Sequence, residues 1–180
     1  MNRRSVLVFV ACAFAAVACS KSTGGAAEAS RFPGTEDGAK QLLSDIRTGD
    51  AKAKTAALKP TTADYKAVFT DDAAAKAEAG YEKLWSDPKA VIAADPANTE
   101  LKLWKATTEE LQQGTGEAAE FPGGYKRVAG KLKPGLTLYR WKYVKPGEKL
   151  GMAYDGLVFV NGRWAWFPKP WRTLGDGPGE

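Results

Sequence analysis

The sequence LTLYRWKYVKPGEKLGMAYDGLVFVNGRWAWFPKPW, residues Leu136–Trp171, contains the strongest indications of how this chain folds. Two turn signals, Pro146-Gly147 and Asn161-Gly162, divide it into runs rich in aromatic and branched side chains. Asn-Gly between apolar runs is the strongest short-range signal for a β-hairpin. The stretch therefore predicts three antiparallel strands, at Leu136–Val144, Lys149–Val160 and Arg163–Phe167.

Pairing the strands through two-residue turns predicts which side chains face each other. The predicted partners are Trp164 with Phe159, Trp166 with Leu157, Tyr139 with Tyr154, Trp141 with Met152 and Tyr143 with Leu150. One face then carries Tyr139, Trp141, Tyr143, Leu150, Met152 and Tyr154. The other carries Leu136, Leu138, Leu157, Phe159, Trp164 and Trp166, with Arg140 and Lys142 toward one end.

Both predicted faces are substantially apolar, unlike an antiparallel sheet with one face in water. Each face must therefore have a cover, or one face must line a cavity. Gly151 and Gly156 are candidate bulge or bend positions. A one-residue bulge at either glycine would exchange the two faces beyond it.

Helical patterns occupy the chain before this meander. Thr35 is a candidate N-cap for a helix, and Thr62 can cap a second. The apolar stripes, at helical spacing, comprise Ala39, Leu42, Leu43 and Ile46, then Tyr65, Val68 and Phe69, then Ala74, Ala77, Tyr81, Leu84 and Trp85. Ser86-Asp87-Pro88 predicts a further short helix through Val91 and Ile92. These stripes predict core packing rather than a cofactor site.

The character of the sequence changes near Asn98. Glu100–Ala106 alternates and predicts a strand. Tyr125–Leu132 is compatible with a strand or a short helix, and we favour the strand. The resulting fold class is α+β, with N-terminal helices packed on a curved antiparallel meander.

Helices followed by a curved meander that ends in an aromatic strand resemble the cone-shaped fold of the nuclear transport factor two-like superfamily, which includes SnoaL-like and ketosteroid-isomerase-like proteins. The resemblance lies in the order of elements over about Thr35–Trp171. It implies a pocket between helices and sheet. It implies no particular reaction, because function resides in sites rather than folds.

The N-terminus has the features of an export leader. Arg3 and Arg4 precede an apolar run from Val6 to Val17, which is shorter than the roughly 20 residues that span a bilayer. The following Ala16-Val17-Ala18-Cys19 resembles a bacterial lipobox, although Leu is commoner than Ala at its first position. The resemblance implies a signal peptide over residues 1–18, cleavage before Cys19, and lipidation and acylation (palmitate) at Cys19. An ordinary signal peptide cut near Ala18 is the alternative.

The resemblance to lipoproteins implies a location in the cell envelope. Ser20, rather than Asp, follows the lipidated Cys, which by similarity to enterobacterial lipoproteins favours the outer membrane facing the periplasm. We expect a lipidated Cys and flexible tether over residues 19–32, a single domain over 33–174 and a frayed tail over 175–180.

Composition excludes several kinds of chemistry. The chain has no His, and its only cysteines are Cys12 and Cys19, so the mature domain has no disulfide and no thiolate metal site. The 26 Lys and Arg residues exceed the 21 Asp and Glu residues by five, and loss of Arg3 and Arg4 with the leader lowers the excess to three. This dispersed charge does not predict nucleic-acid binding. No metal or cofactor is predicted.

A catalytic site is not predicted. A ketosteroid-isomerase-like site needs a carboxylate base and hydroxyl donors inside an apolar pocket. Asp155, Tyr139 and Tyr154 are the residues that could form one, but Asp155 precedes Gly156, where a turn or bulge is expected.

Our first functional hypothesis is therefore a non-catalytic module that binds a small apolar molecule or a peptide. The candidate contact residues are Tyr139, Arg140, Trp141, Lys142, Trp164 and Trp166. The alternative is an accessory protein that docks on another envelope component, with Trp171 as a candidate partner contact. For Trp171 itself, we favour the interpretation that it pins the chain end to the core over the interpretation that it contacts a partner. An isomerase-like or hydrolase-like enzyme is the least favoured hypothesis.

Overall fold

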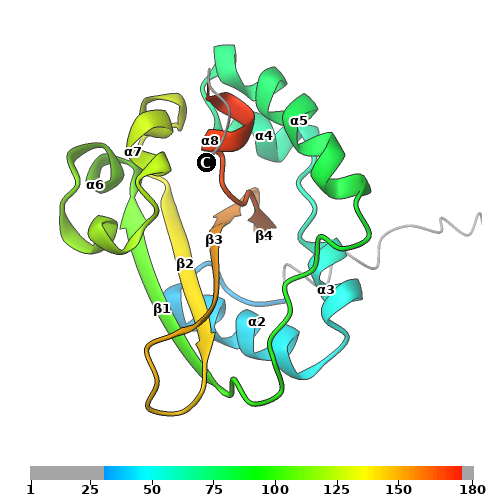
Figure 1. Cartoon of the computed structure of the whole chain (residues 1–180). Helices are drawn as coiled ribbons and strands as arrows, with labels where there is room; N and C mark the ends of the chain where they lie inside the picture. The colour runs from blue at the N-terminus through cyan, green and yellow to red at the C-terminus, as the bar shows by residue number, and fades with distance from the viewer. Residues whose placement is uncertain (1–30, 176–180) are drawn as a thin grey trace, which may run out of the picture.

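The computed structural model describes residues 31–175. The predicted leader, Cys19, most of the predicted tether and the tail beyond Gly175 lie outside the described residues. Within residues 31–175 the chain has the predicted α+β class. Helices α2 to α5 come first, and an open antiparallel sheet with strand order β1-β2-β3-β4 follows, with shorter helices between β1 and β2 and after β4. Figure 1 shows α2 and α3 at one end of the sheet, and α4, α5 and α8 at the other.

The elements have the following bounds. The helices before the sheet are α2 (Glu36–Thr48), α3 (Ala51–Ala57), α4 (Thr62–Val68) and α5 (Asp71–Ser86). The strands are β1 (Glu100–Thr107), β2 (Thr137–Val144), β3 (Gly151–Val160) and β4 (Arg163–Trp166). Between β1 and β2 lie α6 (Thr108–Gln113), the 3-10 helix η1 (Gly116–Glu120), α7 (Gly124–Val128) and η2 (Ala129–Lys131), and α8 (Trp171–Leu174) follows β4.

Side-chain caps fix the starts of the first helices. The Thr35 hydroxyl accepts the Gly38 N–H at 3.1 Å, as the sequence predicted. The cap of α4 is Thr61 rather than the predicted Thr62. Thr61 is preferred because it forms a reciprocal capping box with Asp64, whose carboxylate accepts the Thr61 N–H at 2.9 Å.

The pairing of β3 with β4 matches the prediction: Trp164 faces Phe159 and Trp166 faces Leu157. The predicted pairing of β2 with β3 is wrong, because Tyr143 faces Met152 and Trp141 faces Tyr154. Val144 pairs with Gly151, so the connection spans residues 145–150 instead of a two-residue turn. The observed register of β2 and β3 differs from the predicted register by two residues. Because side chains alternate between the faces, this difference by itself leaves each side chain on its predicted face of the sheet.

A bulge at Gly156 then changes the faces. Tyr139 pairs with Leu157 while Arg140 pairs with Asp155, so Gly156 has no partner on β2. Its φ of 85° lies in the region that favours glycine. The extra residue turns Leu157, Phe159, Trp164 and Trp166 onto the face that carries Tyr139, Trp141 and Tyr143. The predicted separation of these two groups is wrong, although the bulge that reverses it was a candidate.

Each sheet face is covered by helices. The face with Tyr139, Trp141, Tyr143, Leu157, Trp164 and Trp166 packs against apolar side chains of α2 and α3 and against Ile92. The opposite face, with Leu138, Val158, Val160 and Ala165, packs against α4 to α8. Each apolar face of the sheet therefore belongs to its own hydrophobic core.

Two local predictions are wrong. Residues 88–92 form no helix, because the backbone N–H of Ile92 is held by the Thr55 hydroxyl at 2.9 Å and Ala93 binds the Tyr154 hydroxyl. These contacts draw the segment across the sheet. Tyr125–Leu132 is not a strand but forms α7 and η2. Its helical form buries Tyr125 against Trp171, with ring centroids 5.1 Å apart.

A buried ion pair ties the β3–β4 turn to α4. Asp64 is 1% exposed, and its carboxylate contacts Arg163 Nη1 at 2.6 Å and Asn161 Nδ2 at 2.8 Å. Burial alone would raise the pKa of Asp64. The hydrogen bonds from Thr61 and Asn161 and the charge of Arg163 outweigh it, and the pKa lies below its ordinary value.

Candidate functional site

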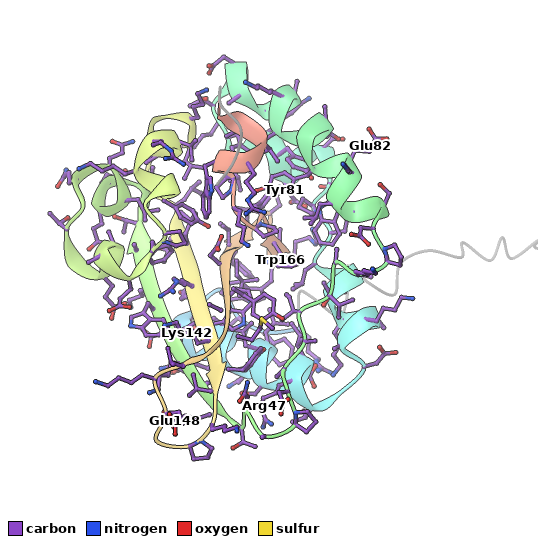
Figure 2. The ribbon with its side chains drawn as sticks, in the orientation of Figure 1. Arg47, Tyr81, Glu82, Lys142, Glu148 and Trp166 are labelled. Atoms are coloured by element: carbon purple, nitrogen blue, oxygen red, sulfur yellow. The ribbon has the colours of Figure 1, made fainter. Side chains whose placement is uncertain are left out.

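A groove lies between α5, the first half of β3 and the segment that follows β4. Its volume is about 510 Å³. Figure 2 labels Tyr81 of α5 and Trp166 of β4, which lie in the space between this helix and the sheet. The groove is lined by Gly80, Tyr81, Lys83, Leu84, Asp87, Met152, Ala153, Tyr154, Asp155, Trp166, Pro168, Lys169, Arg172 and Thr173.

The groove exists because β4 stops early. β4 pairs with the second half of β3 only, from Leu157 to Val160. Pro168 and Pro170 follow and cannot donate to a ladder. Lys169, between them, has a φ of 51°, in the left-handed region. The chain therefore turns away from β3 into α8 instead of continuing as a strand.

The first half of β3 is consequently an open sheet edge. Gly151–Tyr154 pair with β2 alone. Beyond that ladder, their backbone groups make no hydrogen bond within residues 31–175. Gly151, Met152 and Ala153 are exposed, and 54% of Met152 is accessible. An open edge presents unpaired N–H and C=O groups to any extended chain that approaches it.

Aromatic side chains form the apolar wall of the groove. The Trp166 ring lies 6.3 Å from that of Tyr154, and its Nε1 donates to the Asp155 carbonyl at 2.8 Å. Trp166 also packs edge-on against Trp85, with centroids 5.9 Å apart. The Tyr154 hydroxyl is fixed by both backbone groups of Ala93, at 2.7 and 3.0 Å. This wall is therefore held in place by contacts within the protein itself.

Asp155 is the buried carboxylate of the groove, with 5% of its surface exposed. Its Oδ1 accepts the Tyr125 hydroxyl at 2.9 Å and the Lys169 backbone N–H at 2.8 Å. Burial raises the pKa of Asp155, and these two hydrogen bonds offset the rise only in part. Burial also raises the pKa of Tyr125, so its hydroxyl stays protonated and donates. Asp155 thus holds the turn after β4 against β3.

The rim of the groove is mainly basic. Three cations line it: Lys83 of α5, Lys169 before α8, and Arg172 of α8. The carboxylates that line the groove are only two, Asp87 and the buried Asp155. The ammonium groups of Lys83 and Lys169 form no salt bridge with the described residues. The rim therefore favours an anionic group over a cationic one.

The predicted contact residues divide between core and groove. Tyr139, Trp141 and Trp164 are buried, with at most 5% exposure, and pack against α2 and α3. Trp166 is equally buried but lines the groove with one side. The bulge at Gly156 brings these four aromatic residues onto one face, where they fill a core.

Arg140 and Lys142 lie on the opposite face of the sheet. Both cations stack on the Trp104 ring, at 5.2 and 5.6 Å from its centroid, and Arg140 approaches Glu120 at 3.5 Å. Figure 2 shows Lys142 away from Trp166. The structure therefore does not bring these two residues together with the predicted aromatic contacts.

Trp171 lies in the core. It is 9% exposed, and its ring contacts Tyr125 and the backbone at Gly124, where an added Cβ would lie 2.2 Å from the ring. Its burial agrees with the interpretation that it pins the chain end to the core.

Sequence reasoning missed most of the groove. Asp155 and Tyr154 were considered together only as part of a catalytic site. The hydroxyl that donates to Asp155 belongs to Tyr125 instead. Lys83, Leu84 and Met152 carried no signal, because they meet only through tertiary packing. The Pro-Lys-Pro run after β4 was the available signal for the groove. Its prolines cannot pair with the first half of β3, which is therefore left as an open edge.

Comparison of the chain with family models, curated protein sequences and solved structures finds no match. The resemblance to nuclear transport factor two-like proteins therefore stays a prediction. Among residues 31–175, no helix combines the length and apolar character that a membrane crossing needs. The same residues contain no cluster of three His, Cys, Asp or Glu side chains placed to hold a metal ion.

Proposed function

We propose that the protein is a non-catalytic binding module of the bacterial cell envelope that takes an apolar ligand, a small molecule or a peptide, in the groove between α5 and β3. The observation that carries the proposal is the accessible Met152 beside the preformed wall of Tyr154 and Trp166. Binding sites are typically concave and apolar with a few polar groups at their edges. Lys83 and Lys169 on the basic rim are such groups.

The proposal places the module on the envelope through a lipid at Cys19, at the outer membrane facing the periplasm. Metabolic labelling with a lipid precursor tests this part. We expect label in the wild type and in Cys12→Ser, and none in Cys19→Ser. Label that is lost in Cys12→Ser and kept in Cys19→Ser would contradict it.

Native mass spectrometry of the full-length protein, purified gently in detergent from its own envelope, tests the binding itself. We expect a stoichiometric adduct that leaves on denaturation. Met152→Glu should abolish the adduct, because it places a charge beside the apolar wall. Leu150→Glu is the matched control, since Leu150 is 84% exposed but does not line the groove. A bare mass for the wild type, or equal loss in both variants, would overturn the proposal.

One observation favours the alternative function, docking on another envelope component. Leu150 projects 84% of its surface into solvent from the β2–β3 connection, which also carries Lys145 and Lys149. With the single acid Glu148 against two lysines, this connection keeps a net positive charge, so the exposed apolar side chain suits contact with an acidic protein surface. A photoreactive residue at position 150 should then cross-link one envelope protein in cells. The same residue at exposed Lys126 is the control.

A further inference from the structure

The open edge of β3 specifies which ligand the groove takes. We infer that its occupant is a peptide in extended conformation, which adds to the sheet as a strand beside Gly151–Asp155 and carries an acidic group toward Lys83 and Lys169. The inference rests on the proposed function, since it names the ligand class of the same groove.

The first step is the direction of the backbone groups. The Asp155 carbonyl points away from β2, because it accepts Trp166 Nε1 from the side of β4. In an antiparallel strand, the N–H and C=O of one residue point to the same side, and the side alternates along the chain. Ala153 therefore presents its N–H and C=O at the open edge, and Gly151 does so one repeat further on.

The second step is the space beside these groups. Trp166 pairs with Leu157, and the chain leaves the sheet directly afterwards at Pro168-Lys169. A strand added beside Gly151–Asp155 would continue the line of β4 over about 17 Å, at roughly 3.4 Å per residue. Unpaired donors and acceptors on every second residue match the backbone of an extended peptide. A compact apolar molecule would leave them unused.

The third step is the side chains. A peptide residue directly opposite Met152 or Tyr154 shares their face of the sheet, as cross-strand partners do, and an apolar or β-branched side chain fits there. Lys83 and Lys169 lie on the rim without a salt-bridge partner among the described residues. A carboxylate on the peptide supplies the missing charge.

The experiment begins with selection of peptides from a randomised display library against the full-length protein in detergent. The strongest binder is synthesised with a fluorescent label, and single N-methyl groups are moved along its backbone. We expect Kd to rise about tenfold or more at every second residue, where the amide pairs with β3, and to change less than about twofold at the residues between. Amide hydrogen exchange should slow at Ala153 on binding.

Charge and location are tested with variants. Lys83→Glu should weaken the selected peptide about 2–5-fold, the range for a partly exposed ion pair. Lys126→Glu, on α7 and away from the groove, should leave Kd unchanged. Met152→Glu should abolish binding.

The outcomes separate the two proposals. Strand addition is overturned if N-methylation has the same effect at every position, or if amide exchange at Ala153 does not slow on binding. If binding still depends on Met152 in that case, the groove remains a binding site. Recovery of no groove-dependent peptide while the envelope adduct depends on Met152 would also overturn strand addition alone. Absence of both would overturn the proposed function.

Discussion

Replacing Gly156 with alanine tests the bulge on which the arrangement of the sheet depends. Gly156 has a φ of 85°, and an ideal Cβ there would lie 2.0 Å from the backbone oxygen of Phe167 and 2.6 Å from its carbonyl carbon. Neither atom belongs to a flexible side chain. The backbone itself must therefore move if position 156 carries a methyl group.

The expected cost has two parts. A non-glycine residue in the left-handed region costs roughly 1–2 kcal/mol, and the lower entropy of the unfolded alanine chain offsets about 0.4–1 kcal/mol of it. Movement of Phe167 would also break its 2.8 Å hydrogen bond to the Gly156 carbonyl, which costs about 1–3 kcal/mol where the groups stay buried. We expect Gly156→Ala to lower the free energy of unfolding by about 3 kcal/mol.

Gly147→Ala is the matched control. Its φ of 78° is close to that of Gly156, but among residues 31–175, apart from its own chain neighbours, no heavy atom lies within 4 Å of its ideal Cβ. Only the conformational part of the cost applies, so we expect a loss of about 1 kcal/mol. The difference between the two variants, about 2 kcal/mol, measures the clash with Phe167.

Urea unfolding followed by tryptophan fluorescence measures both losses, because four tryptophans (Trp141, Trp164, Trp166 and Trp171) are buried in the cores. A domain of this size has a free energy of unfolding of about 5–15 kcal/mol, so the expected loss is readily resolved. Equal losses in the two variants, or a loss below about 1 kcal/mol for Gly156→Ala, would refute the reasoning.

Two further predictions concern the contacts that hold the ends of the sheet. Trp171→Ala should lower the free energy of unfolding by about 3–5 kcal/mol, because it leaves a cavity against Gly124 and Tyr125. The control Trp171→Phe should lower it less. A melting temperature of Trp171→Ala close to that of the wild type would contradict the core role and make Trp171 a candidate partner contact again. Asp64→Ala should cost about 3–5 kcal/mol in urea unfolding at neutral pH, because it leaves Arg163 charged and only partly satisfied, and adding Arg163→Met should recover part of the loss. Because the pKa of Asp64 is lowered in the folded state, its contribution is complete above the ordinary value of 3.8 and is lost as pH falls through the folded pKa. The difference between wild type and Asp64→Ala should therefore narrow below about pH 3.8, and a constant difference would contradict the assigned pKa shift.

Local sequence signals predicted most of the elements. The spacing of Ala39, Leu42, Leu43 and Ile46 predicted α2, and Asn161-Gly162 predicted the β3–β4 hairpin with its register. These signals succeed because helical periodicity and a two-residue turn depend on residues close together in the chain. The strand favoured at Tyr125–Leu132 failed because packing of Tyr125 against Trp171, far along the chain, outweighs local strand preference.

Residues close together in the chain were enough to predict the α+β class and the two apolar sheet faces, since periodicity and turn residues act locally. The tertiary structure was needed to establish which aromatic side chains share a face, because one unpaired residue at Gly156 reverses every side chain beyond it. It also decided the groove, since Lys83, Met152 and Lys169 belong to segments that meet only when α5 packs beside the open edge of β3. Such contacts depend on the summed packing of both cores, which no local pattern in the sequence records.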